Sequence, residues 1–176
     1  MNKVSVSIVV LFLLLAGLGS FQVYSYFNRP KTAYIIIKDV YDAFTLKKEL
    51  EKKFTGIRDA REKILDSLAV TVKLIAKQID NEKGKDKGHI ELYNLKREDF
   101  FKKKKAMGED NDQLTKQYDQ EIVTQLNQYV KDYGAENGYI YIYGSDGNGS
   151  LMYAREEANI SKQVIAYINR KYRGEK

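Results

Sequence analysis

The sequence predicts an α+β protein in which a small β-sheet body carries a long antiparallel α-helical hairpin arm, preceded by a transmembrane helix. Three observations favour this fold class: an uncharged N-terminal stretch, two long helix-forming regions around a polar loop, and a two-residue periodicity near the C-terminus. The 176 residues suit one domain plus a membrane segment. The absence of Cys and the single His argue against disulfides, a thiol nucleophile and a metal site, so no cofactor is expected.

The N-terminal stretch from residue 4 to residue 28 has no charged side chain and is long enough to cross a bilayer. Phe21, Tyr24, Tyr26 and Phe27 lie at its far end, which is typical of an interfacial aromatic belt. We therefore predict a signal anchor over residues 1–29. A cleaved signal peptide is the alternative, but the small residues that precede a cleavage site are poorly placed. In both cases residues 30–176 form an exported domain.

The exported domain begins with a predicted strand over residues 33–39, AYIIIKD. A helical hairpin arm is predicted over residues 40–135, with its tip at NEKGKDKGH (81–89). Its two helices are expected to be about equally long and to project roughly 60 Å, at 1.5 Å per residue. Gly134 is the expected residue after the end of the second helix.

The C-terminal region changes to a strand-like period. YIYIY, the polar segment GSDGNGS and LMYA predict a β-hairpin over residues 138–154, followed by a helix over residues 158–172. A three-stranded sheet of this size has exposed edges, and two helices alone bury little surface. Oligomerisation is therefore expected.

Three segments carry a resemblance to the Skp/OmpH family of periplasmic chaperones. They are AYIIIKDVYDAF, KKELEKKF and, most specifically, the C-terminal run from QLNQYVKDYG to NISKQVIAYINRKY. The resemblance covers residues 33–172 and is closest to the form found in Bacteroidota. The residues that match the family's ending are Leu151, Tyr153, Ala154, Asn159, Ile160, Ser161, Val164, Ile168, Asn169, Lys171 and Tyr172.

The resemblance implies a trimer whose helical arms hold unfolded outer-membrane or envelope proteins without ATP. An uncleaved anchor departs from the family's usual form, because it would tether the domain to the inner membrane through residues 4–27, with the domain in the periplasm. A cleaved N-terminus would leave a soluble periplasmic protein. The alternative function is that of a structural or assembly component of an envelope secretion or conjugative transfer complex, since the TrbI protein also has an anchor and similar ends.

Positive charge concentrates on the distal part of the predicted arm. Residues 77–105 contain ten cationic and six acidic side chains, and their net charge of +4 equals that of residues 30–176. Such a surface either attracts acidic clients or lipid headgroups, or only keeps the helices soluble. Because a helix distributes four consecutive lysines around its faces, some of Lys102 to Lys105 are expected to point inward. The candidate client-binding residues are Lys83, Lys85, Lys87, Lys96, Arg97, Phe100, Phe101, Lys102, Lys103, Lys104 and Lys105.

Aromatic residues give two further candidate sites. Phe100 and Phe101 either contact unfolded chains or close the hairpin against its first helix. Tyr139, Tyr141 and Tyr143 are expected on one face of a strand, as a subunit interface or as an ordinary amphipathic strand.

The remaining polar residues predict no chemistry. His89 is expected to be solvent-exposed at the tip, and no set of acid, base or nucleophile converges, so the chain is predicted not to be an enzyme. Nucleic acid is not an expected partner, because the chain is exported and has no reading motif.

Overall fold

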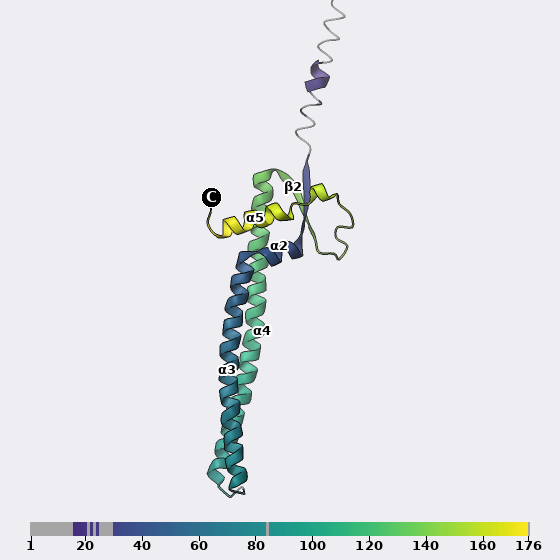
Figure 1. The fold of residues 1–176 in the computed structure, drawn as a ribbon. Helices are drawn as coiled ribbons and strands as arrows, with labels where there is room; N and C mark the ends of the chain where they lie inside the picture. Colours follow the sequence, from purple (N-terminus) through teal and green to yellow (C-terminus); the bar gives the residue numbers. More distant parts are fainter. Residues whose placement is uncertain (1–15, 21, 23, 25–29, 84, 176) are drawn as a thin grey trace, which may run out of the picture.

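The computed structural model describes residues 16–20, 22, 24, 30–83 and 85–175, and Figure 1 shows an elongated protein with a small body and one long arm. The arm consists of the helices α3 (Thr45–Asn81) and α4 (Lys87–Asn137). The body contains the strands β1 (Lys31–Ile36) and β2 (Tyr139–Ser145), the helices α2 (Ile37–Ala43) and α5 (Ser161–Tyr172), and a 3-10 helix, η1 (Glu156–Ala158). The predicted combination of a small sheet with long helices is confirmed.

The predicted anchor over residues 4–27 lies for the most part outside the described residues. Among the residues that are described, no helix has both the length and the apolar character needed to span a bilayer.

The sheet differs from the prediction in its strands and in their direction. It has two strands, and β1 pairs with β2 in parallel, with Tyr34 opposite Tyr143. The first strand begins at Lys31 and ends at Ile36, so Lys38 and Asp39 belong to α2 rather than to a strand. Leu151 to Ala154 form no strand. The β-hairpin predicted over residues 138–154 is therefore wrong.

The connection after β2 explains why the chain does not return along that strand. Asn159 forms a bridge with Tyr34, and the amide of Ile160 donates a hydrogen bond of 2.9 Å to the carbonyl of Tyr34. β1 is thus bonded to β2 on one side and to Asn159 on the other. Residues 146–158 cross past β1 to reach its far edge, so a return strand beside β2 is incompatible with the path of the chain.

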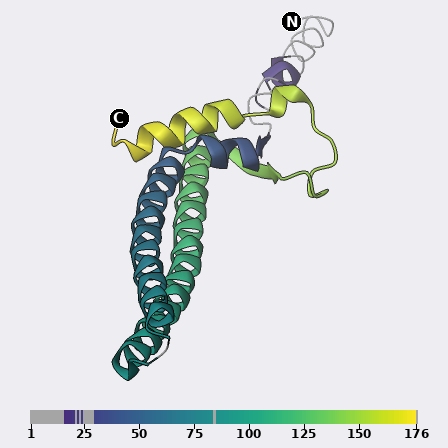
Figure 2. The ribbon, with the colours of Figure 1, turned by 60° about the horizontal axis from the view of Figure 1, so that its bottom comes forward.

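The arm is built from two helices that lie side by side in both views (Figures 1 and 2). Near the body, Lys53 of α3 lies over the ring of Tyr118 of α4. Farther out, Arg61 bonds to Asn111. Residue numbers thus rise along α3 as they fall along α4, so the two helices run in opposite directions. α3 has 37 residues and α4 has 51, rather than equal lengths, because α4 continues past the arm into the body. The tip connection is shorter than predicted, since α4 begins at Lys87.

The end of α4 also differs from the expected position. The helix runs through Gly134 and ends at Asn137, and the left-handed φ of 71° at the following cap residue, Gly138, suits glycine. Gly134 is buried instead, and a Cβ added there would lie 3.2 Å from the side chain of Ile142. Its small size lets β2 approach the helix closely.

The core lies where α5 crosses the inner end of the arm (Figure 2). Val40, Phe44, Val164 and Ile168 are fully buried there, packed against Ile122 and other apolar residues of α4. Phe44 has an extended backbone, and it breaks the predicted continuous helix into α2 and α3. Its ring makes edge contacts with Tyr129 and Tyr172, at centroid distances of 6.1 and 5.7 Å.

Side chains near the two ends of α5 hold the starts of the two helices that flank Phe44. Neither α2 nor α3 receives a side-chain hydrogen bond from its own N-cap residue. The Ser161 hydroxyl accepts from the Ile36 amide at 2.8 Å, and the Asn169 side-chain oxygen accepts from the Thr45 amide at 2.8 Å. α5 therefore provides hydrogen-bond acceptors for backbone amides at the starts of α2 and α3. The residues in each pair are more than 120 positions apart in the sequence.

Candidate functional site

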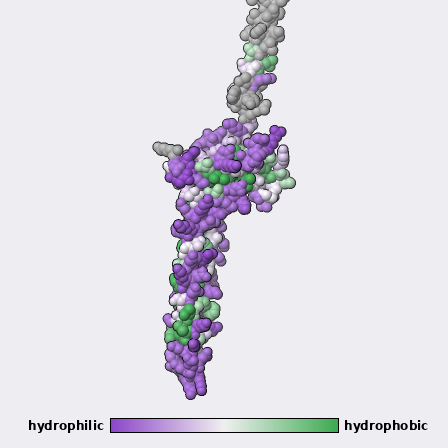
Figure 3. Space-filling model, in the orientation of Figure 1, coloured by the Kyte–Doolittle hydropathy of each residue, from purple (hydrophilic) through white to green (hydrophobic). Residues whose placement is uncertain are grey.

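The outer part of the arm exposes apolar side chains. We call residues 64–105 the distal arm. Six large apolar residues there are at least 39% exposed, whereas Val123 is the only such residue between 45 and 63 or 108 and 137. Figure 3 shows the resulting apolar patch above a hydrophilic tip. The six residues are Ile64, Val70, Leu74, Leu92, Leu95 and Phe101.

The inward face of the distal arm is a separate set of residues. Ile75 is buried, and Tyr93, Phe100 and Met107 are half-buried at helical spacing along α4. Phe100 is half-buried on this inward face, and its neighbour Phe101 points outward, with 54% of the residue exposed. The two rings meet edge to face at 5.4 Å, and the guanidinium of Arg97 lies 5.6 Å from the Phe101 ring.

The lysine run does not point inward as predicted. Lys102 to Lys105 are all exposed, because they fall between the inward positions Phe100 and Met107, which are two helical turns apart. Lys102 bonds to Glu98 at 2.6 Å, which raises the pKa of Lys102, and Lys103 bonds to Asp99 at 2.9 Å. Exposed pairs of this kind contribute little stability, so these lysines remain available to partners.

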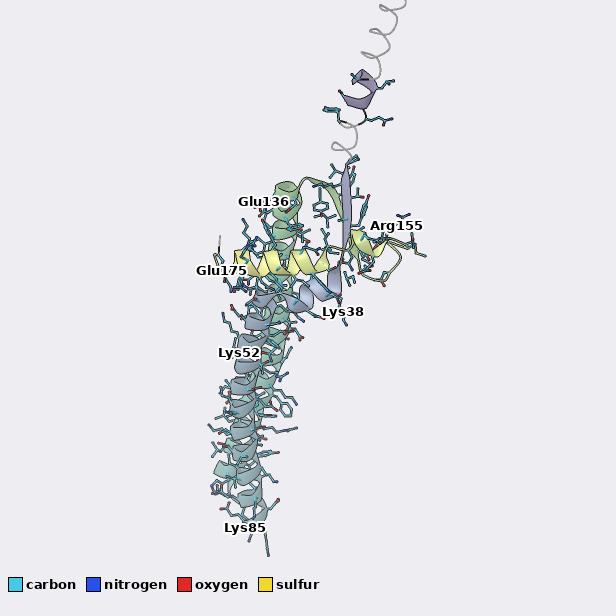
Figure 4. All side chains as sticks on the ribbon, turned by 45° about the horizontal axis from the view of Figure 1, so that its top comes forward. Lys38, Lys52, Lys85, Glu136, Arg155 and Glu175 are labelled. Atoms are coloured by element: carbon cyan, nitrogen blue, oxygen red, sulfur yellow. The ribbon has the colours of Figure 1, made fainter. Side chains whose placement is uncertain are left out.

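The other predicted cationic residues surround the same surface. Lys83 and Lys85 belong to the tip connection, and Figure 4 places Lys85 at the end of the arm. Lys87 begins α4, and Lys96 and Arg97 lie on α4 before the aromatic pair. The structure therefore brings the predicted basic residues together with apolar residues that the prediction omitted. Val70, Leu74, Leu92 and Leu95 fall off the inward stripe, and this irregularity is the sequence signal that would have identified them.

The tyrosines of β2 do not share one face. Tyr139 pairs with Lys31 and Tyr141 with Thr32, so Ile140 is the extra residue of a bulge that shifts the alternation. Tyr139 stacks on Tyr133 of α4, at a centroid distance of 6.0 Å. Tyr141 and Tyr143 are about half exposed, and their rings lie 5.9 Å apart.

The outer edge of β2 is open. In the part of the chain that the structure describes, β1 is the only strand paired with β2. An unpaired edge that carries exposed aromatic side chains suits the addition of another chain.

The tip holds one group of possible metal ligands. Glu82, Asp86 and His89 offer ligand atoms that lie within 4.8 Å of one another. His89 Nδ1 is 2.8 Å from Glu82 Oε2, and the hydrogen bond to Glu82 raises the pKa of the imidazole. His89 is thus not a free surface residue: 32% of its side chain is exposed. The sequence interpretation missed this group because it considered His89 alone.

Comparisons with known proteins agree with this architecture. Residues 31–168 match the outer membrane protein (OmpH-like) family. A comparison with curated proteins gives no match. Among solved structures, an OmpH-like protein of Caulobacter crescentus CB15, described as an outer membrane chaperone, aligns with a TM-score of 0.70 at 12% identity. The alignment covers 81% of this chain and 85% of that one, and at this identity it shows a shared fold.

The family match spans well over half of the chain and contains β1, the whole arm, β2 and most of α5. The chain therefore belongs to the OmpH-like family of outer membrane proteins.

Proposed function

We propose that this protein is a periplasmic holdase that binds unfolded outer-membrane or other envelope proteins without ATP. Family membership supports a chaperone role in the periplasm. The observation that carries the proposal is that the distal arm combines exposed large apolar side chains with the surplus positive charge of the domain. An unfolded chain offers both apolar segments and carboxylates, and a long surface of this composition can meet them in many registers.

The apolar and cationic residues have different parts in this proposal. Side chains such as Leu74, Leu95 and Phe101 are more than half exposed, so their burial against a client supplies the affinity. The lysines act at longer range and increase the rate of encounter with acidic segments. The Lys102 to Lys105 run is the densest part of this charge.

We further propose that the body forms a homotrimer. The open edge of β2 and the exposed rings of Tyr141 and Tyr143 support this interface, whereas Tyr139 supports it indirectly by fixing β2 against α4. The proposed domains are an N-terminal anchor over residues 1–29 and the OmpH-like domain over residues 30–176. In this arrangement residues 4–27 tether the body to the inner membrane. Light scattering of the full chain in detergent that gives the mass of a monomer would contradict the trimer.

The alternative is a structural or assembly component of an envelope secretion or conjugative transfer complex, as suggested by the resemblance to TrbI. The same open edge of β2 favours it, because one dedicated partner could add a strand there. A pull-down in mild detergent separates the two functions. A single stoichiometric partner supports the complex, and many substoichiometric envelope proteins support the holdase.

Neutralising the lysine run tests the electrostatic part of the proposal. We expect the variant with Lys102, Lys103, Lys104 and Lys105 all changed to Gln to bind an unfolded acidic β-barrel protein about tenfold more weakly at about 0.01 M salt. The difference in affinity between the variant and the wild type should shrink at about 1 M salt, where the Debye screening length is about 3 Å. Fluorescence anisotropy of the labelled client measures both affinities.

The matched control removes four exposed lysines in the body or near it, by changing Lys38, Lys48, Lys52 and Lys116 to Gln. This variant loses the same charge and should bind within about twofold of the wild type at both salt concentrations, because its lysines lie away from the apolar patch. Equal weakening by the two variants would show that only the total charge of the protein matters.

A further inference from the structure

The tip of the arm brings together three side chains with the chemistry of metal ligands. Glu82 directly follows α3, Asp86 caps α4, and His89 lies in the first turn of α4. From these positions we propose that the tip binds one divalent transition-metal ion, such as Zn²⁺, through Glu82, Asp86 and His89. This inference does not depend on the proposed function.

The spacing of the donor atoms supports this assignment. His89 Nδ1 lies 2.8 Å from Glu82 Oε2 and 3.4 Å from Asp86 Oδ2. Zinc binds His nitrogen and carboxylate oxygen at about 2.0–2.2 Å, which places two ligands of a tetrahedral site about 3.3 Å apart. The donors therefore need only small movements to surround an ion. Water completes the coordination, because all three side chains are partly exposed.

The backbone around Asp86 holds one of these ligands in position. Asp86 Oδ1 accepts hydrogen bonds from the Gly88 amide at 2.7 Å and the His89 amide at 3.4 Å. That oxygen is used in capping the helix, so Oδ2 is the oxygen that faces the imidazole. The same carboxylate can thus cap α4 and bind the ion.

The type of donor selects the class of ion. One imidazole with two carboxylates suits Zn²⁺ and neighbouring transition metals, whereas Mg²⁺ and Ca²⁺ prefer ligands that are all oxygen. Lys83, Lys85 and Lys87 are exposed near the cluster, and they reduce the affinity for any cation. A bound ion would link the end of α3 to the start of α4 and so fasten the tip of the arm.

Protons compete with the metal for the same nitrogen. Metal binding requires the neutral imidazole, so the affinity for zinc should fall as the pH is lowered.

Calorimetric titration of the full chain in detergent with Zn²⁺ tests the proposal. We expect one ion per chain at neutral pH, weaker binding at pH 5, and no displacement by excess Mg²⁺. His89→Gln, Glu82→Gln and Asp86→Asn should each weaken binding by at least about tenfold. Asn caps a helix about as well as Asp, so Asp86→Asn keeps the fold of the tip.

Asp146→Asn is the matched control. Like Asp86, Asp146 accepts a hydrogen bond from the backbone amide two residues ahead, here that of Asn148 at 2.9 Å. It should leave zinc binding unchanged. The proposal is overturned if zinc does not bind saturably, if the three tip variants bind it as the wild type does, or if Mg²⁺ displaces it.

Discussion

Replacing Phe44 with Ala is expected to lower the free energy of unfolding by about 3–5 kcal/mol. The ring is completely buried and lies between α2 and α3, where it touches Tyr129 of α4 and Tyr172 at the end of α5. Its removal opens a cavity at the point where the arm joins the body. The surrounding side chains come from three helices, so they cannot all move in to fill the space.

Urea unfolding followed by circular dichroism, at a fixed protein concentration, measures this loss. Phe101→Ala is the matched control: the same truncation at an exposed ring should change the free energy of unfolding by no more than about 0.5 kcal/mol. Phe44→Leu should recover much of the stability, because it keeps most of the apolar volume. A loss below about 1 kcal/mol for Phe44→Ala would contradict the packing described for this joint.

Replacing Asn169 with Ala is expected to destabilise the protein by about 1–3 kcal/mol. The side chain of Asn169 accepts from the amide and the hydroxyl of Thr45, both at 2.8 Å, and donates to the carbonyl of Ala43 at 3.1 Å. These bonds are partly buried. Alanine leaves the first turn of α3 without its cap and separates α5 from the base of the arm.

Asn169→Asp distinguishes the cap from the rest of the side chain. Aspartate still accepts from Thr45, and its charge is favourable at a helix N-terminus, but it cannot donate to Ala43. We expect a loss of about 1 kcal/mol, smaller than that of Asn169→Ala. Asn94→Ala, at an exposed position of α4, is the control and should be nearly neutral. Equal losses for Ala and Asp would show that Asn169 does not act as a cap.

The parts of the fold that depend on local pattern could be predicted from the sequence. A long run of apolar residues at helical spacing, without proline, predicts each arm helix whatever its surroundings. The break at Phe44 could not be predicted in this way, because Val40 and Phe44 are four residues apart and continue a helical pattern. The break depends on the pocket that α4 and α5 provide for the ring.

Long-range pairing explains the other differences. The glycine-rich segment between YIYIY and LMYA is a good local signal for a hairpin. It is overridden because β2 pairs with β1, more than 100 residues earlier, and because the chain must then reach the other edge of β1. The bonds from Ser161 and Asn169 to helix starts are invisible to local pattern for the same reason, although the family resemblance included both residues.

The candidate site could be predicted only in part. Net charge is additive along a sequence, so the basic distal arm could be found by counting. Which apolar residues are exposed depends on how the two helices face each other. The sequence places Leu92 and Leu95 off the helical stripe of Tyr93 and Phe100, and the packing of the two helices decides that this stripe faces inward.

The central claim is that the exposed apolar residues of the distal arm bind unfolded chains. The most direct test is light scattering from an unfolded outer-membrane β-barrel protein diluted out of urea. It compares wild type with a variant in which Leu74, Leu92, Leu95 and Phe101 are all Gln, and with Val123→Gln as control. A loss of about 1.4 kcal/mol of binding free energy, from apolar surface no longer buried against the client, weakens binding tenfold. It is therefore enough to raise tenfold the concentration of this protein that half-suppresses aggregation of the client. We predict at least that increase for the fourfold variant and no change for the control; equal suppression by all three proteins would contradict the claim.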